Sequence, residues 1–130
     1  MRIARTLLDQ IVAHAQRDAP NECFGVVGAR DGTGATVYEL ENVAHSPYRF
    51  ENGVDLAHAQ FAMEDAGEQL GAIYHSHTRS APEPSQTDIN WAVTYPGAEW
   101  IIVGLKGDEP EVRSFLIEDG DVREVTLEIT

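Results

Sequence analysis

The expected fold and function of this chain depend on one stretch of its sequence, HSH at residues 75–77 followed by SQTD at residues 85–88. Side chains alternate along a strand, so the two histidines would leave the same face. A proline-containing loop then allows Asp88 to return to the end of that strand. Two imidazoles and one carboxylate leave the fourth position of a tetrahedral zinc ion open for water. The stretch therefore predicts a catalytic zinc site with His75, His77 and Asp88 as ligands.

Glu22 is the candidate base for this site. It begins residues 22–29, an otherwise apolar stretch that predicts a buried strand. If that strand lies beside the one that carries His75, Glu22 can take a proton from zinc-bound water and pass it to a leaving amine. A glutamate at the start of a strand is also often only a solvated strand end. Together the four polar side chains favour a metal-dependent hydrolase.

Ser85 and Asp88 also have a local explanation. A serine followed three positions later by an acid resembles a capping box at the start of a helix, and the helix dipole favours an acid in the first turn. The two interpretations are compatible, because a capped helix start would hold Asp88 in place toward the metal. Ser85 is therefore expected both to cap the helix and to donate its hydroxyl to the site.

The bulk composition is that of one soluble globular domain covering residues 1–130, with 42% apolar and 24% charged residues. The formal charge of −13 argues against nucleic acid as a partner, because nucleic-acid binding relies on clustered basic residues. The single Cys23 excludes an intrachain disulfide and suits a reducing compartment. No secretory signal or membrane span is visible, so a cytoplasmic protein without membrane contact is expected.

The order of predicted elements favours the α/β (α+β) class, a mixed β-sheet with helices packed against it. In the helix at 54–68, the helical spacing of apolar residues suggests an apolar face of Val54, Ala57, Phe61, Ala62 and Ala66. Helices are predicted at residues 3–17, 54–68 and 86–94, and strands at residues 22–29, 35–42, 71–77, 99–105, 111–117 and 121–129.

Two glycines, Gly25 and Gly28, interrupt the strand that follows Glu22. Glycine in a strand indicates a bend or the close approach of another backbone, and a substrate peptide is one candidate for that backbone. We therefore expect strand addition near Glu22, or near the segment around Tyr48. Cys23 faces away from Glu22 by strand alternation and is interpreted as a small buried apolar residue.

At this point the sequence resembles a family, the JAMM (MPN-plus) metalloproteases. The resemblance rests on Glu22, on the histidine pair and on the Ser85-x-x-Asp88 pattern in this order and spacing, and it extends along the domain. The segment YHSHT at residues 74–78 is especially similar to small stand-alone bacterial members. These include enzymes that remove cysteine from the C-terminal glycine of a ubiquitin-fold sulfur carrier. The resemblance implies a JAMM/MPN-like fold of the cytidine-deaminase-like type.

The resemblance also implies a role for each matching residue. His75, His77 and Asp88 would bind Zn²⁺, Glu22 would act as general base and then acid, and Ser85 would donate to the oxyanion or position the carbonyl. The implied substrate is the Gly-Gly tail of a ubiquitin-fold or sulfur-carrier protein, cleaved after glycine with release of cysteine as one option. The loop at residues 79–84 departs from the pattern in its prolines and in Glu83. Long insertions are absent, which puts cleavage of ubiquitin chains in doubt.

Several alternatives remain open from the sequence. An isopeptidase that removes a ubiquitin-like modifier would use the same residues. A 2-His-1-carboxylate iron enzyme uses the same ligand types, although no histidine follows His77 as a cupin would require. A non-catalytic MPN scaffold would need neither the ligands nor Glu22. The sequence also leaves the oligomeric state open, with a homodimer among the options.

Overall fold

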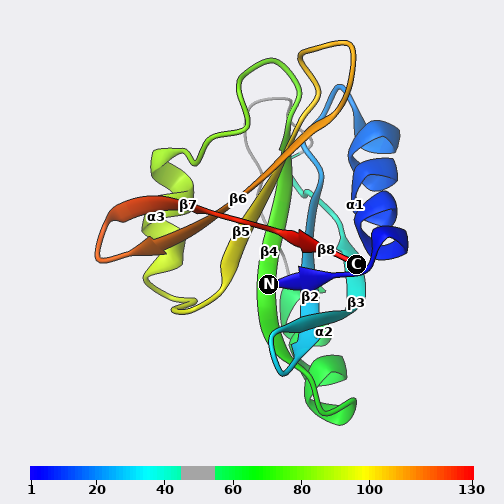
Figure 1. The fold of residues 1–130 in the computed structure, drawn as a ribbon, viewed down its shortest axis with the longest axis vertical. Coiled ribbons are helices and arrows are strands. Elements are labelled where there is room, and N and C mark those ends of the chain that lie inside the picture. Colours follow the sequence, from blue (N-terminus) through cyan, green and yellow to red (C-terminus); the bar gives the residue numbers. More distant parts are fainter. Residues whose placement is uncertain (45–54) are drawn as a thin grey trace.

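The computed structural model describes residues 1–44 and 55–130, in which one mixed sheet of eight strands is covered by helices on both faces (Figure 1). The strand order is β7-β6-β5-β4-β2-β3-β1-β8. The elements are β1 (Arg2–Ile3), α1 (Arg5–Asp18), β2 (Phe24–Arg30), β3 (Thr33–Leu40), α2 (Asp55–Asp65), β4 (Gln69–His77), α3 (Gln86–Ala92), β5 (Glu99–Gly104), β6 (Glu111–Glu118), β7 (Asp121–Val125) and β8 (Glu128–Ile129). This arrangement confirms the predicted α+β class.

The pairing of the central strands brings distant segments to one end of the sheet. Strand β2 runs antiparallel to both β3 and β4, and Phe24 pairs with His75. Strands β4 and β5 are parallel, with α3 in the connection between them. The start of β2 therefore lies beside the end of β4, which brings Glu22 next to the histidines.

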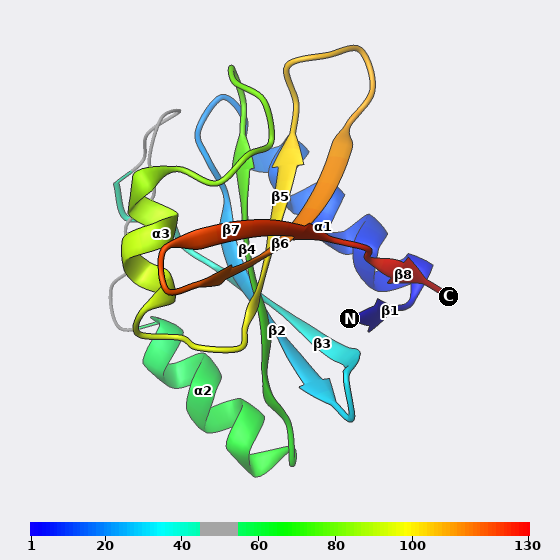
Figure 2. The same cartoon turned by 60° about the vertical axis from the view of Figure 1, so that its left-hand side comes forward.

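Helices cover the two faces of the sheet unequally, with α1 on one face and α2 and α3 on the other (Figure 2). Each face has its own apolar core. The core beneath α2 and α3 contains Phe24, Val26, Leu56, Ala59, Met63, Ile73, Ala92, Trp100, Ile102, Phe115 and Ile117. The core beneath α1 contains Ile3, Ile11, Ala15, Cys23, Val27, Val37, Ala72, Tyr74, Ile101 and Val103. Each large side chain buried in this way stabilises the fold by about 1.5–3 kcal/mol.

Both N-terminal and C-terminal predictions need small corrections. Helix α1 begins at Arg5 rather than at residue 3, because Ile3 belongs to the short strand β1 and is fully buried there. The strand predicted at residues 121–129 divides into β7 and β8. Strand β7 pairs with β6, whereas β8 pairs with β1 at the opposite edge of the sheet. Between Val125 and Glu128 the chain therefore passes from the β7 edge of the sheet to the β8 edge.

The predicted helix at residues 54–68 is present as α2, but its predicted apolar face is wrong. The buried residues of α2 are Leu56, Ala59 and Met63, at spacings of three and four. Phe61 is instead 66% exposed, and Ala57 is also exposed. Leucine and methionine bury more apolar area than the alanines of the predicted face, so their side of the helix packs against the sheet. Val54 lies outside the described residues.

The two strand glycines were expected to mark a bend or the close approach of another backbone, and only Gly28 agrees, since the register of β2 shifts beside it against both β3 and β4. Gly25 lies inside the sheet, where β3 and β4 are hydrogen-bonded on the two sides of β2 and leave no room among the described residues for a further strand. The space above Gly25 is instead filled by the ring of Tyr74, and that above Gly28 by the carboxylate of Glu68. Strand addition beside β2 is therefore excluded. The alternative segment around Tyr48 lies outside the described residues.

Candidate metal centre

Strand β4 presents the two histidines of the motif on one face, as alternation predicts. The ring centroids of His75 and His77 lie 5.1 Å apart. His75 is almost fully buried and packs edge-on against Trp100, with ring centroids 6.3 Å apart, whereas His77 is 9% exposed. Both rings are therefore buried, and His77 is the outer member of the pair because a small part of it reaches solvent.

Two buried carboxylates flank the inner histidine. The Nε2 atom of His75 lies 2.9 Å from Oδ1 of Asp88, and its Nδ1 atom lies 3.5 Å from Oε1 of Glu22. Asp88 is fully buried and Glu22 is 4% exposed. One potential ligand atom from each of Glu22, His75 and His77 lies within 4.8 Å of the others. The structure thus brings together Glu22, His75, His77 and Asp88, although Asp88 is outside that group of three.

The electrostatics of this cluster favour a positive charge at its centre. Burial alone would lower the pKa of His75, but the carboxylates of Asp88 and Glu22 outweigh it and raise that pKa to about 9. Burial would raise the pKa of Asp88, but His75 and His77 and the Ser85 backbone amide lower it. Two buried carboxylates beside neutral imidazoles carry uncompensated negative charge, which a proton or a metal cation can offset.

The donor set of this cluster fits a zinc ion. Oδ1 of Asp88 is buried and lies 2.9 Å from Nε2 of His75, without the alignment of a normal hydrogen bond. Buried polar atoms are normally satisfied, so a carboxylate oxygen in this setting is suited to a cation. Zinc in proteins is bound by imidazole nitrogen and carboxylate oxygen of this kind. The residues present therefore fit the metal that the sequence predicted.

The loop after β4 orients the outer histidine. Nδ1 of His77 lies 2.7 Å from the carbonyl oxygen of Ala81. Because a carbonyl can only accept, Nδ1 must carry the proton, which leaves the lone pair of Nε2 available for a metal. The neighbouring Pro82 is buried against Gly104 of β5. A backbone carbonyl that fixes the tautomer of a ligand in this way is typical of metal sites.

Helix α3 holds Asp88 as the sequence predicted. Ser85 is the N-cap, with its Oγ 3.4 Å from the backbone nitrogen of Asp88. In return the backbone N–H of Ser85 donates to Oδ2 of Asp88 at 2.8 Å. This capping box occupies Oδ2 and turns Oδ1 toward His75. The Ser85 side chain is exposed, and the role of its hydroxyl at the oxyanion stays a prediction.

Polar contacts that the sequence interpretation did not anticipate also support the site. Asn42 is buried and its Nδ2 donates to the carbonyl oxygen of Glu22 at 2.9 Å. Glu83 of the proline-rich loop lies 3.3 Å from Arg113 of β6. An asparagine after a strand forms no recognisable sequence motif. Asn42 reaches Glu22 only because β2 pairs with β3. These contacts were therefore not predictable from residue type and spacing.

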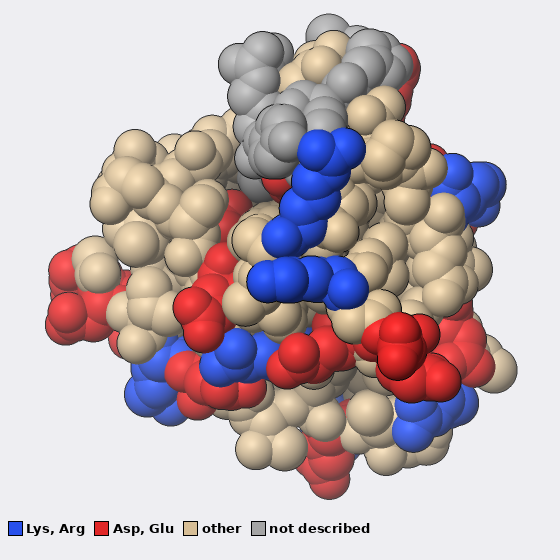
Figure 3. Space-filling view, turned by 90° about the horizontal axis from the view of Figure 1, so that it is seen from above, with Lys and Arg blue, Asp and Glu red and all other residues tan. Residues whose placement is uncertain are grey.

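The surface around the site carries charges of both signs. Figure 3 views the end of the molecule where β4 ends, and it shows basic side chains near the centre and acidic side chains around them. The loops after β4 and β5 supply Arg79 and Lys106, both exposed. A cavity of about 240 Å³ beside Glu22 is lined by Asp18, Asn21, Glu41 and Asn42 as well as Glu22. The net charge of −13 belongs to the whole chain and therefore does not predict the mixture of basic and acidic side chains on this surface.

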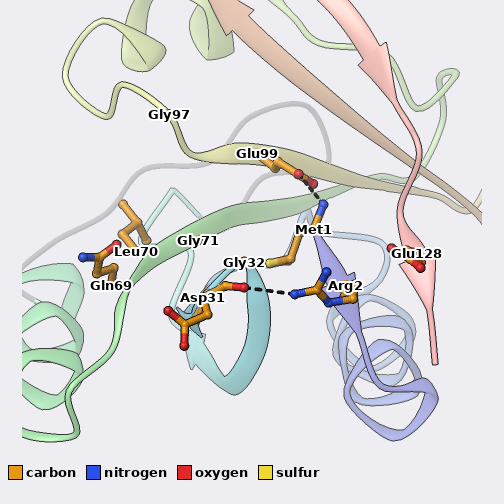
Figure 4. A pocket seen from close by; sticks show the side chains of 11 residues that line it. Met1, Arg2, Asp31, Gly32, Gln69, Leu70, Gly71, Gly97, Glu99 and Glu128 are labelled. Carbon is orange, nitrogen blue, oxygen red and sulfur yellow. Dashed lines mark hydrogen bonds and ion pairs between the residues drawn. The ribbon is translucent and has the colours of Figure 1, made fainter.

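A second cavity, of about 400 Å³, lies at the other end of the strands (Figure 4). It is bordered by the start of β4 at Gln69, by Glu99 and by Asp31 in the turn after β2. None of the four motif residues lines it. This cavity is therefore separate from the candidate metal centre.

Among the described helices, none is long and apolar enough to cross a membrane.

Comparison with known proteins agrees with this geometry. A family described as prokaryotic homologs of the JAB domain matches residues 4–118. The chain is 37% identical to the CysO-cysteine peptidase of Mycobacterium tuberculosis, over 98% of this chain and 89% of that protein. It is 36% identical to a probable TtuB-protein conjugate cleaving protease of Thermus thermophilus, over 96% and 80% of the two chains. It is 32% identical to a desampylase of Haloferax volcanii, over 82% of each.

Solved structures share the same architecture. A solution structure of a protein from Desulfitobacterium hafniense superposes with a TM-score of 0.80 at 29% identity, covering 100% of this chain and 93% of that one. A structure described as a JAMM metalloprotease-like zinc site in the proteasome and signalosome has a TM-score of 0.67 at 21% identity, over 100% and 97% of the two chains. At that lower identity the likeness concerns the fold.

Proposed function

The chain belongs to the prokaryotic homologs of the JAB domain, within the JAMM/MPN group, and from this we propose that it is a zinc-dependent peptidase. The observation that carries the proposal is the buried convergence of Glu22, His75, His77 and Asp88 from three separate segments. A scaffold without catalysis gains nothing from two carboxylates buried against histidines, because burying such charges is costly. We take residues 1–130 as one catalytic domain.

His75, His77 and Asp88 would hold the zinc ion through Nε2, Nε2 and Oδ1. The lone pair of Nε2 in His77 is free for this because Nδ1 donates to Ala81. Oδ1 of Asp88 and Nε2 of His75 already face one another. When bound, zinc would polarise the scissile carbonyl and make water a competent nucleophile near neutral pH. His77 is the less buried of the two histidines, so the substrate would approach from its side.

Glu22 would move the proton during the reaction. Its Oε1 lies 3.5 Å from Nδ1 of His75, and within residues 1–44 and 55–130 no hydrogen bond holds it as the capping box holds Oδ2 of Asp88. A carboxylate in this place can take a proton from the attacking water and return it to the amine that leaves. The Ser85 hydroxyl, exposed at the start of α3, would donate a hydrogen bond to the oxyanion or position the carbonyl.

The proposed substrate is the C-terminal Gly-Gly tail of a ubiquitin-fold or sulfur-carrier protein. The names of the three relatives support this class, since they refer to CysO-cysteine, to TtuB conjugates and to desampylation. Cleavage after the second glycine would release cysteine, as the name of the mycobacterial relative suggests. The second candidate is an isopeptidase that removes a ubiquitin-like modifier, which the names of the other two relatives favour.

The test is intact-mass analysis of a ubiquitin-fold carrier ending in Gly-Gly-Cys after incubation with the protein. Loss of cysteine from the carrier is expected with the wild type and not with Glu22→Gln or after chelation. Glu22→Gln should retain about one zinc per chain, whereas His77→Ala should lose both zinc and activity. An isopeptide-linked carrier, run in parallel, distinguishes the second candidate.

Two results would contradict the proposal. Turnover by Glu22→Gln at the wild-type rate would remove the base. A purified protein that holds iron instead of zinc would favour the 2-His-1-carboxylate enzyme, and one that holds no stoichiometric metal would favour the scaffold.

A further inference from the structure

Two hydroxyl residues alternate with the histidines, Ser76 within β4 and Thr78 directly after its end. Strand alternation places Ser76 on the face opposite His75 and His77. Oγ of Ser76 accepts a hydrogen bond from the backbone N–H of Cys23 at 2.8 Å, and Ser76 is fully buried. Oγ1 of Thr78 donates to the carbonyl oxygen of Pro20 at 3.0 Å.

These two hydrogen bonds lie on either side of Glu22 in the sequence. The segment from Ala19 to Cys23 connects α1 to β2 and belongs to neither element. Glu22 therefore precedes the first residue of the ladder, Phe24, and receives no support from the pairing of β2 with its neighbours. A connecting segment without regular hydrogen bonds is normally the more mobile part of a fold.

A third side chain acts on Glu22 itself. Nδ2 of Asn42 donates to the carbonyl oxygen of Glu22 at 2.9 Å, and Asn42 is 5% exposed. Oδ1 of Asn42 accepts from the backbone N–H of Ala44, so the amide is fixed at both ends. The segment is thus held at Pro20, Glu22 and Cys23 by side chains from β4, from the residue after β4 and from the residues after β3.

We propose that Ser76, Thr78 and Asn42 are positioning residues that hold the proton-transferring carboxylate of Glu22 at the metal centre. The inference rests on the proposed function, in which Glu22 moves the proton. The need for such residues follows from geometry, because a misplacement of about 1 Å in a catalytic group can cost about 10²-fold in rate. Oε1 of Glu22 lies 3.5 Å from Nδ1 of His75, and small shifts of the segment would change that placement directly.

The arrangement gives residues 75–78 two functions on two faces. The histidines contribute to the metal centre on the face of α2 and α3. The hydroxyls fix the segment that brings the base to the same centre from the neighbouring strand. Loss of a hydroxyl should therefore reduce proton transfer while the metal stays bound, which no ligand substitution can do.

The experiment compares Thr78→Val, Thr78→Ser and Ser76→Ala with the wild type and Glu22→Gln. Valine keeps the shape of threonine and removes the hydroxyl, whereas serine keeps the hydroxyl. The measurements are kcat and KM on the Gly-Gly-Cys carrier, and zinc affinity by chelator competition. We expect Thr78→Val and Ser76→Ala to lower kcat about 10–100-fold with KM and zinc affinity within about twofold of wild type. Thr78→Ser should restore most of kcat.

Thr36→Val is the matched control, because the Thr36 hydroxyl donates to Glu68 at 2.7 Å near the other end of the sheet. It should lower stability to a similar extent and leave kcat unchanged. A readout independent of turnover is hydrogen exchange of the Cys23 amide in metal-free protein. That amide should exchange at least tenfold faster, relative to the core, in Ser76→Ala than in Thr36→Val.

The outcomes separate the two proposals. If Glu22→Gln is inactive but Thr78→Val and Ser76→Ala both have the wild-type kcat, the positioning role is wrong and the base assignment stands. If the hydroxyl variants lose zinc together with activity, or if Thr36→Val loses kcat equally, the effect is general destabilisation and the positioning role is again wrong. If Ser76→Ala does not fold, Thr78→Val and Thr78→Ser decide, since Thr78 is only half-buried.

Discussion

Gly104→Ala is expected to weaken zinc binding, although Gly104 has no side chain and is not one of the proposed metal ligands. A Cβ atom at this position would lie 2.9 Å from Cδ and 3.0 Å from Cγ of Pro82. Ordinary contact begins at 3.4 Å, so Pro82 would have to move by about 0.5 Å. Pro82 directly follows Ala81, whose carbonyl oxygen accepts from Nδ1 of His77.

The size of the effect follows from that displacement. If Ala81 moves with Pro82, its distance of 2.7 Å to His77 would lengthen toward about 3.2 Å, the upper end of the usual hydrogen-bond range. Loss of a partner that orients a metal-binding histidine typically costs about 10–100-fold in affinity. Because the bond would be weakened rather than removed, we expect about tenfold, or about 1.4 kcal/mol of binding free energy.

The assay is competition for zinc with a chromophoric chelator, with Gly107→Ala as control. Gly107 lies three residues further along the same chain, and the nearest described atom to a Cβ there would be the Glu109 carbonyl oxygen, at 3.8 Å. Both variants add one methyl group to the same region, but only Gly104→Ala should lose affinity. Equal zinc affinity of the two variants would refute the argument that Pro82 and Ala81 orient His77.

Three further results are expected from the core. Gly25→Val should lower the free energy of unfolding by about 3 kcal/mol or more in urea titrations, since a side chain there would overlap the buried ring of Tyr74; wild-type stability would contradict this packing. Cys23 should resist alkylation in the native protein and react once unfolded, because burial raises the pKa of its thiol to about 12. Burial is the main cause that lowers the pKa of His14 below its ordinary value. Neutral His14 therefore stabilises the folded state above about pH 6.5, and this stabilisation is lost as the pH falls through the lowered pKa. The urea midpoint of the wild type should therefore decrease more on acidification to about pH 5 than that of His14→Gln.

Local patterns were sufficient to predict the elements that form the site. The alternation of residues 75–77 placed both histidines on one face, and the serine and acid of residues 85–88 form the capping box that they indicated. Both features depend on residues close in sequence, where backbone geometry leaves few options. The fold class followed from the order of helices and strands.

Features that depend on distant residues were not predictable in the same way. The ring above Gly25 belongs to Tyr74, which pairs with it across β2 and β4, and no local pattern identifies that neighbour. The buried face of α2 was assigned wrongly because alanines and Phe61 were counted ahead of Leu56 and Met63. Choosing between two faces of a weakly amphipathic helix requires knowledge of the surface it meets.

The candidate site stands out in the sequence because its chemistry restricts residue types, whereas the groups that support it do not stand out. A ligand must be a histidine, cysteine or carboxylate, so it stands out in a sequence. A supporting group can be any donor or acceptor, including the Ala81 carbonyl and the Ser76 hydroxyl. Such groups are identified only when the fold brings them to their partners. The groups proposed to position the base and the ligands are therefore identified only in the structure, whereas the proposed ligands themselves stand out in the sequence.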